Sequence, residues 1–303
     1  MRVTSLFPSA TEIAFAIGAG DDVVGVSHAC DYPPEVSNGR TVVTKQRFDP
    51  SELSSAEIYR RKVETTRQFG SLFRLDETAM WKCQANVVLT QGPAEFSLVS
   101  IHAVRAIAEG LNPRPELLVL YPRHLDDVLD DHARAGFATG RMGEARALVD
   151  EMRERIAAVE TTVRGLRRRQ VGFIEWIDPT ISGGFWIPQL IEIARGQDAL
   201  NTPGLSPARF HWPELRKQNP DTLIIACDGL SIDRLRSEMT LLTERPGWWE
   251  LTARRLGRVY IGDGAYFTRA GPRLVEGLEA LAWAVHPDLF PEPSPEVLLR
   301  FGD

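Results

Sequence analysis

Aromatic residues gather in predicted loops of the second half of the chain, where they could hold a flat ligand. They end strand-like runs or lie in segments rich in glycine and proline: Trp176, Phe185, Trp186, Phe210, Trp212, Tyr266 and Phe267. Ligands of open parallel sheets bind beyond the carboxyl ends of the strands. Rigid rings give contact area at a small entropy cost, so the set predicts a site for a large, partly apolar, planar molecule. Any one ring could instead pack in the core, and we adopt that interpretation for Trp248, Trp249 and Trp283, on predicted helices.

The segment from His28 to Asp31 places metal-capable side chains close together. In a loop after a strand, His28 and Cys30 could face the same side. A zinc site normally needs further ligands, and the neighbouring sequence offers none. We therefore predict no metal site. A neutral His28 could instead hydrogen-bond ligand amides or approach a bound cobalt ion axially.

The motifs of several common enzyme classes are missing. The sequence has no Gly-x-Ser-x-Gly elbow, no phosphate-binding Gly-x-x-x-x-Gly-Lys loop and no His-Glu-x-x-His helix. Asp228-Gly229 and Asp263-Gly264 are turn signals before they are candidate acids. These observations predict a binding protein rather than an enzyme. An enzyme acting on a ligand in the same place is the alternative, because fold does not fix function.

The start of the chain predicts the first element that would position a ligand. A short apolar run leads to Ser9 and Glu12, which have the spacing of a helix capping box. Gly18 and Gly20 then end the helix, and a second strand follows over residues 23–26. Strand, turn, helix and strand begin a Rossmann-like lobe. The N–H groups at the helix start would face whatever lies above the sheet edge.

The same alternation continues along the chain and predicts parallel sheets. Further strands are predicted over residues 87–90, 117–120, 171–174, 223–226 and 259–261, and helices over 100–109, 124–135, 188–194, 231–239 and 272–285. Apolar residues at helical spacing also predict one long helix over residues 142–167. It would be roughly 35 Å long. Taken alone, it could be an ordinary surface helix or a connection between two lobes.

Length and composition limit the class of protein. The chain of 303 residues is long enough for two lobes with cores of their own. A net charge of −6 argues against nucleic acid as the main partner. No apolar run is long enough to span a membrane, so we expect no membrane insertion. Three widely spaced cysteines give no disulfide framework, which favours a reducing compartment.

Several segments together carry a family resemblance that covers nearly the whole chain. In order they are residues 6–12, 24–28, 31–34, 172–179, 220–225 and 266–273. Their order and spacing resemble those of the cobalamin-binding substrate-binding proteins, which are helical-backbone binding proteins of ATP-driven (ABC) importers. Related members bind siderophores and haem.

The resemblance implies an α/β fold with two Rossmann-like lobes, parallel sheets and a ligand cleft between the lobes. The domains would be an N-terminal lobe over residues 1–141, a bridging helix over 142–167 and a C-terminal lobe over 168–303. The ligand would be cobalamin or another corrinoid, carried as cargo with no intrinsic cofactor, by a protein that we expect to be a monomer. Haem or a siderophore is the alternative ligand.

The resemblance also implies a binding site and a docking site. The family's pocket falls on Pro8, Ser9, Ala10, Thr11, His28, Asp31, Tyr32, Gln91, Trp176, Tyr266 and Arg269. This chain departs from the cobalamin-binding pattern at Ala29 and Gln91, where aromatic residues are expected. It also lacks the Cys-x-x-Cys that cytoplasmic-type relatives often carry shortly after the position of Gln91. Carboxylates that would meet an ABC permease fall on Asp76, Glu77 and Glu214. Exposed carboxylates at helix starts explain these three residues equally well.

The first residues predict the compartment. Met1 is followed almost at once by a core strand, with neither a basic-then-apolar leader nor a cysteine for lipid attachment. We therefore predict a leaderless relative in the cytoplasm, working as a carrier or sensor. The alternative is an importer component in the periplasm or at the cell surface, with its leader removed.

Overall fold

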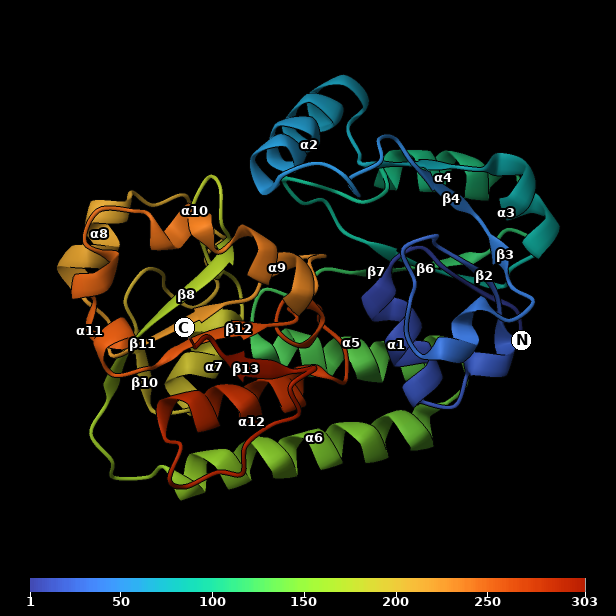
Figure 1. The fold of residues 1–303 in the computed structure, drawn as a ribbon. Coiled ribbons are helices and arrows are strands. Elements are labelled where there is room, and N and C mark those ends of the chain that lie inside the picture. Colours follow the sequence, from blue (N-terminus) through green and yellow to red (C-terminus); the bar gives the residue numbers. More distant parts are fainter. Residues whose placement is uncertain (303) are drawn as a thin grey trace. The chain divides into compact units, whose positions relative to one another are not determined.

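The computed structural model describes residues 1–302, which fold as two compact units (Figure 1). The first unit comprises Met1–Leu53, Glu57–Pro122 and Asp126–Glu151. The second comprises the chain from Met152 onward together with two short segments, Ser54–Ala56 and Arg123–Leu125. The chain therefore contributes residues to the second unit well before the main boundary.

The first unit contains a five-stranded parallel sheet in the order β3-β2-β1-β6-β7. Its strands are β1 (Val3–Ser5), β2 (Val23–Val26), β3 (Thr41–Val42), β6 (Val87–Gln91) and β7 (Glu116–Leu120). A separate antiparallel pair joins β4 (Thr44–Gln46) to β5 (Phe73–Leu75). The helices are α1 (Pro8–Ala16), α2 (Ser55–Phe69), α3 (Glu77–Cys83), α4 (Ile101–Gly110), α5 (Leu125–Ala138) and α6 (Met142–Thr162), with short turns η1 (Gly20–Asp22) and η2 (Pro34–Ser37). Of these helices, α2, α5 and α6 each include residues of the second unit.

The sheet of the first unit is covered on both faces. Val87 and Leu89 belong to the same buried cluster as Ile13 of α1. Val88, between them, belongs to a second cluster with Val104 of α4. Successive side chains of a strand point to opposite faces. A strand buried on both sides therefore reads as the continuous apolar run seen in the sequence.

The prediction of a capping box at the start of α1 is wrong. The helix begins at Pro8, and its N-cap Phe7 makes no side-chain cap hydrogen bond. Proline suits the first helical position, because it lacks an N–H that would be unsatisfied there. Ser9 is therefore already inside the helix, and both Ser9 and Glu12 are buried.

The second unit contains a six-stranded mixed sheet, in which β10, β8, β11, β12 and β13 are neighbours in that order. Its strands are β8 (Arg169–Trp176), β9 (Ile181–Ser182), β10 (Gly196–Asp198), β11 (Thr222–Ile225), β12 (Val259–Gly262) and β13 (Leu298–Arg300). The four strands from β10 to β12 are parallel, whereas β9 and β13 pair antiparallel to β8 and β12.

Helices and short turns complete the second unit. They are α7 (Ile187–Ile193), α8 (Trp212–Gln218), α9 (Ile232–Glu238), α10 (Thr240–Thr243), α11 (Thr252–Arg255) and α12 (Leu274–Val285), with η3 (Trp248–Glu250) and η4 (Gly264–Tyr266). In this unit α7 contacts α12, α9 contacts β12, and α11 contacts β11. The sheets and the alternation of strands and helices confirm the predicted α/β class.

The long helix α6 is shorter than the sequence predicts. It has 21 residues and ends at Thr162, which corresponds to about 32 Å. Gly165 has a φ of +81°, a conformation that glycine adopts at little cost, so the chain leaves the helix before it. The boundary between the units falls within α6, after Glu151. No helix within residues 1–302 has both the length and the apolar composition needed to cross a membrane.

The tryptophans predicted to pack in the core differ in burial. Trp248 and Trp283 are buried, as expected. Trp249 is 64% exposed, so the prediction that it packs in the core is wrong. The guanidinium of Arg254 lies 4.8 Å from the centre of its ring. This tryptophan therefore packs against a charged side chain and not in the core.

Candidate functional site

Topology brings the first unit's candidate residues to one edge of its sheet. β1 runs parallel to both β2 and β6, so the carboxyl ends of the three strands lie at the same edge. β1 leads into Pro8, β2 leads into His28, and β6 ends at Gln91. This edge therefore carries the predicted contact residues that follow each of the three strands.

Short hydrogen bonds fix the loops at this edge. Thr11 Oγ1 donates to Ser5 Oγ over 2.8 Å and lies 3.0 Å from Cys30 Sγ. His28 Nδ1 lies 2.7 Å from Thr44 Oγ1. These contacts tie the loops after β1 and β2 to each other and to β4.

Partial burial of the His28 ring favours its neutral form. Its ring is half-buried and meets the ring of Phe73 edge-on, with 4.4 Å between centroids. Burial lowers the pKa of His28, against a smaller opposing effect of its hydrogen bond with Thr44. Within residues 1–302, no group of three or more His, Cys, Asp or Glu side chains could hold a metal ion. His28 thus suits a hydrogen bond to a neutral ligand group.

The other candidates of the first unit differ in accessibility. Asp31 and Tyr32 are exposed, and Gln91 is half-buried with its Oε1 accepting a long 3.5 Å hydrogen bond from the Leu98 amide. Pro8 is half-buried, whereas Ser9, Ala10 and Thr11 are buried. The accessible candidates are therefore Pro8, Asp31, Tyr32 and Gln91, whereas the three small side chains that follow Pro8 in α1 are buried.

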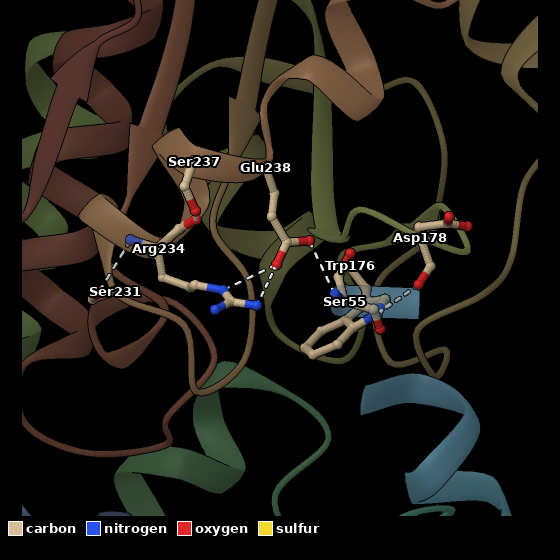
Figure 2. Close-up of polar contacts among 7 residues, drawn as sticks. All are labelled: Ser55, Trp176, Asp178, Ser231, Arg234, Ser237 and Glu238. Atoms are coloured by element: carbon tan, nitrogen blue, oxygen red, sulfur yellow. Dashed lines mark hydrogen bonds and ion pairs between the residues drawn. The ribbon is translucent and has the colours of Figure 1, made fainter. Parts of the chain in front are cut away.

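Trp176, at the carboxyl end of β8, is fixed by hydrogen bonds inside the second unit (Figure 2). Its ring is 4% exposed, and its Nε1 donates to the carbonyl oxygens of Asp178 at 3.0 Å and Ser55 at 3.2 Å. Ser55 belongs to the short segment that the second unit takes from the start of α2. Packing and two acceptors account for the position of this indole.

Sequence reasoning missed the charged pair beside Trp176. Glu238 accepts the Ser55 amide at 3.0 Å and binds Arg234 through its other oxygen at 2.7 Å and 3.0 Å (Figure 2). The i,i+4 spacing of Arg234 and Glu238 on a predicted helix was the available signal. No sequence signal pointed to the hydrogen bond between Glu238 and Ser55, which lie 183 residues apart.

Four more of the predicted contact rings lie in the packing of the second unit. Trp186 Nε1 donates to the Phe267 carbonyl at 2.8 Å, and the Phe267 ring is completely buried. Trp212 stacks on Trp248 at 6.2 Å between centroids, and its Nε1 donates to a backbone carbonyl. Phe210 is also buried. The burial of these rings does not depend on a ligand.

Phe185 and Tyr266 are the loop rings that stay half-buried. Phe185 has a φ of +55°, and the Arg123 guanidinium lies 6.0 Å from its ring centre. The Arg273 guanidinium lies 4.9 Å from the Tyr266 ring, and burial raises the pKa of the Tyr266 hydroxyl. Arg269, three residues further on, is half-buried as well. These residues are the accessible part of the predicted set in this unit.

A glycine sets the position of the Tyr266 loop. A Cβ on Gly277 of α12 would lie 2.0 Å from the Tyr266 carbonyl oxygen. Real Cβ atoms do not approach backbone oxygen so closely, so the loop rests directly on the helix only because residue 277 has no side chain. The loop's half-buried residues therefore have a firm support.

The chain is similar in sequence to several curated proteins, although no model of a known protein family matches it. It is 25% identical over 302 residues to the uncharacterized ABC transporter substrate-binding lipoprotein YvrC of Bacillus subtilis, covering 96% of this chain and 82% of that protein. It is 25% identical over 291 residues to a cobalamin-binding protein of Halobacterium salinarum, covering 94% and 69%. It is 49% identical over 52 residues to a vitamin B12-binding protein of Vibrio cholerae, covering 17% and 19%.

Solved structures share the fold at lower identity. The periplasmic vitamin B12 binding protein BtuF of Vibrio cholerae has a TM-score of 0.66 and 16% identity, covering 94% of this chain and 96% of its own. A periplasmic heme binding protein of Pseudomonas aeruginosa has a TM-score of 0.71 and 19% identity, covering 99% of both chains.

The comparisons overturn the predicted compartment. YvrC is a lipoprotein, and both of these solved structures are periplasmic proteins. The prediction of a cytoplasmic location is therefore wrong. It rested on the residues at the start of the sequence, whereas similarity along the chain points to the periplasm or cell surface. The chain is thus similar in sequence to a substrate-binding lipoprotein of an ABC transporter and to cobalamin-binding proteins, and it shares its fold with periplasmic vitamin B12-binding and heme-binding proteins.

Proposed function

We propose that this protein is the substrate-binding component of an ABC importer and carries a corrinoid outside the cytoplasmic membrane, without catalysing a reaction. Its similarity to a cobalamin-binding protein over 94% of the chain is the observation that carries the proposal. The short region that is 49% identical to a vitamin B12-binding protein adds support. The domain division that goes with this function is an N-terminal lobe over residues 1–141, a bridging helix over 142–167 and a C-terminal lobe over 168–303.

The proposed ligand contacts lie at the carboxyl edge of each sheet. Accessibility favours Tyr32 and Gln91 in the first unit and Phe185, Tyr266 and Arg269 in the second. The rings would contact the face of a planar ligand, and the amide and guanidinium would hydrogen-bond its polar edge. The buried members of the predicted set would hold the loops from beneath.

Ligand titration tests the proposed function. Cyanocobalamin, cobinamide and haemin are each titrated into the protein, with binding followed by quenching of tryptophan fluorescence and by the visible spectrum. At least one corrinoid should bind with a Kd in the micromolar range or tighter, roughly −8 kcal/mol. Binding of haemin alone would replace the corrinoid by haem, and absence of binding to all three would refute a tetrapyrrole ligand.

Two ring substitutions make that titration specific. Tyr266→Ala removes a half-buried ring of the proposed site and should weaken binding at least fivefold, about 1 kcal/mol or more. Trp249→Ala removes an exposed ring outside the proposed site and should leave the Kd unchanged. Equal effects of the two substitutions would show that Tyr266 does not contact the ligand.

The proposed docking carboxylates differ in what they already do. Asp76 accepts the Ala79 amide at 3.0 Å as the N-cap of α3 and pairs with Lys45 at 3.3 Å. Glu214 accepts the His211 amide at 2.9 Å at the start of α8. Glu77 is exposed in the first turn of α3. Since capping occupies the other two, we propose Glu77 as the clearest probe of permease docking.

Uptake by cells separates docking from ligand binding. Glu77→Lys should lower the rate of corrinoid uptake while leaving the Kd of the purified protein unchanged. Glu52→Lys, at another exposed carboxylate of the first unit, is the matched charge reversal. Equal uptake rates for the two variants would argue against a docking role for Glu77.

A further inference from the structure

A basic cavity lies at the amino-terminal edge of the second sheet. It has a volume of about 480 Å³, and its lining includes Arg169, Asp221 and Arg258. Arg169 begins β8, Asp221 directly precedes β11, and Arg258 directly precedes β12. Because these three strands are parallel, the cavity lies at the edge opposite their carboxyl ends. It is therefore distinct from the proposed corrinoid contacts of this unit.

The charge of the lining is positive in a chain whose net charge is −6. Four arginines line the cavity and two aspartates oppose them: Arg167, Arg168, Arg169, Arg258, Asp221 and Asp288. Asp221 is partly engaged elsewhere, since its Oδ2 accepts the Gln170 amide at 3.0 Å. Burial lowers the pKa of Arg169, and repulsion from Arg258 lowers it further. The lining thus carries a net positive charge.

Two buried nitrogen atoms at the cavity also lack a hydrogen-bond partner among the described residues. They are Nη1 of Arg169 and Nε2 of His286. His286 is 5% exposed, and its ring makes a hydrogen bond with the Ala194 backbone. A buried polar atom without a protein partner can bond to a water or to a ligand. Here, both occur at one positively charged cavity.

We propose that this cavity binds a phosphate group, with Arg169 and Arg258 as its charged donors. A guanidinium presents paired N–H groups whose spacing matches phosphate oxygens. The cavity volume suits a small ligand. A metal cation is disfavoured because the lining carries two more arginines than aspartates. The phosphate could belong to a free anion or to a phospholipid headgroup.

His286 gives this site a titratable reporter. Burial lowers the pKa of its imidazole, and Arg169 and Arg258 lower it further. Arg167 and Arg168 also line the cavity and disfavour the imidazolium, whereas Asp221 and Asp288 favour it. A bound phosphate would offset the positive charge and accept a hydrogen bond from protonated Nε2. The pKa of His286 should therefore rise when phosphate binds.

The experiment has two arms that distinguish the sources of phosphate. In the first, inorganic phosphate is titrated into the full chain at constant ionic strength, by calorimetry and by NMR of the His286 ring. In the second, the protein is floated with vesicles of phosphatidylglycerol and, separately, of phosphatidylcholine. A Kd in the millimolar range or tighter, or flotation with the anionic vesicles alone, is the expected result.

Charge-matched variants decide whether the cavity is responsible. Arg169→Gln and Arg258→Gln should each weaken the interaction at least tenfold, and either suffices should the other fail to fold. Arg236→Gln removes the same charge from an exposed position of α9 and should change nothing. Variant-sensitive binding of phosphate assigns a free anion, and variant-sensitive flotation alone assigns a headgroup. Absence of both, or binding insensitive to the cavity variants, would overturn the proposal, whatever the corrinoid titration shows.

Discussion

Glu238 holds the first turn of α2 from a position 183 residues further along the chain, and its removal should destabilise the second unit. Its Oε2 accepts the Ser55 amide, and its Oε1 accepts two N–H groups of Arg234 (Figure 2). The amides of a first helical turn have no partner within the helix. A carboxylate there satisfies one of them and also interacts favourably with the helix dipole.

The size of the effect follows from burial. The Glu238 side chain is 10% exposed and that of Arg234 is 29% exposed. Removing one partner of a fully buried pair costs about 3–5 kcal/mol. Because water reaches part of Arg234, we expect Glu238→Ala to lower the free energy of unfolding by about 2–3 kcal/mol. Glu238→Gln keeps an acceptor for Ser55 and should cost about 1 kcal/mol.

The assay combines a global and a local measurement. Urea unfolding followed by tryptophan fluorescence gives the change in stability, and hydrogen exchange at the Ser55 amide reports the contact itself. The matched control is Asp150→Ala, which removes an i,i+4 ion pair with Arg146 whose side chains are 56% and 85% exposed. Exposed pairs of this kind contribute little, so the control should cost less than about 0.5 kcal/mol.

Two results would refute this reasoning. Glu238→Ala and Asp150→Ala could prove equally stable, or exchange at Ser55 could be unchanged in Glu238→Ala. A double-mutant cycle with Arg234→Ala adds a quantitative limit. A coupling energy below about 0.5 kcal/mol would mean that the two side chains act independently.

Three further predictions concern packing and pH. Trp176→Ala should lower the free energy of unfolding by about 3–5 kcal/mol, because the ring is buried and twice hydrogen-bonded. The control Trp249→Ala removes an exposed ring and should change the free energy of unfolding by less than about 0.5 kcal/mol. Equal melting temperatures for the two variants would contradict this prediction. Gly277→Ala should lower the free energy of unfolding by about 1–3 kcal/mol, because its Cβ would clash with the Tyr266 carbonyl. Gly143→Ala places a Cβ in open space in α6 and should raise the free energy of unfolding by up to about 1 kcal/mol. Equal melting temperatures for the two variants in thermal unfolding would contradict this contrast. Burial raises the pKa of Asp198 from 3.8 to about 7, so its native carboxyl binds a proton more tightly than the unfolded one and its contribution to stability is lost as pH rises from 4 to 7. Asp198→Asn should remove that part of the decline in the free energy of unfolding, as measured by urea unfolding across this pH range. Parallel pH profiles for the variant and the unchanged protein would argue against this prediction.

The sheet elements could be predicted because their physical causes are local. Strands buried on both faces read as short apolar runs, and the runs predicted over residues 87–90 and 223–226 differ from β6 and β11 by only one or two residues. The helix predicted over residues 272–285 begins two residues later in the structure, at Leu274. The antiparallel strand β13 was missed, since its pairing with β12 depends on residues almost forty positions apart.

The candidate rings could not be assigned, because distant acceptors decide where each one lies. Trp176 donates to Ser55, 121 residues away, and Trp186 donates to Phe267, 81 residues away. The local sequence of a glycine-rich loop with a tryptophan is the same whether the indole contacts a ligand or donates to a distant carbonyl oxygen. The expected capping box failed for a related reason, because Pro8 begins the helix and the N-cap is Phe7, two residues before Ser9.

The division of the rings changes the chemistry expected of the proposed site. With five of the seven predicted loop rings of the second unit buried, the accessible candidates of that unit are Phe185, Tyr266 and Arg269. These residues of the second unit offer two aromatic faces, a phenol hydroxyl and a guanidinium. A corrinoid carries a ring of amide side chains around an apolar macrocycle, so it can use both kinds of contact. An unsubstituted hydrocarbon plane could not, since binding it would leave the polar side chains desolvated and unpaired. For the proposed site, this division favours a planar ligand with a polar periphery over one that depends on stacking alone.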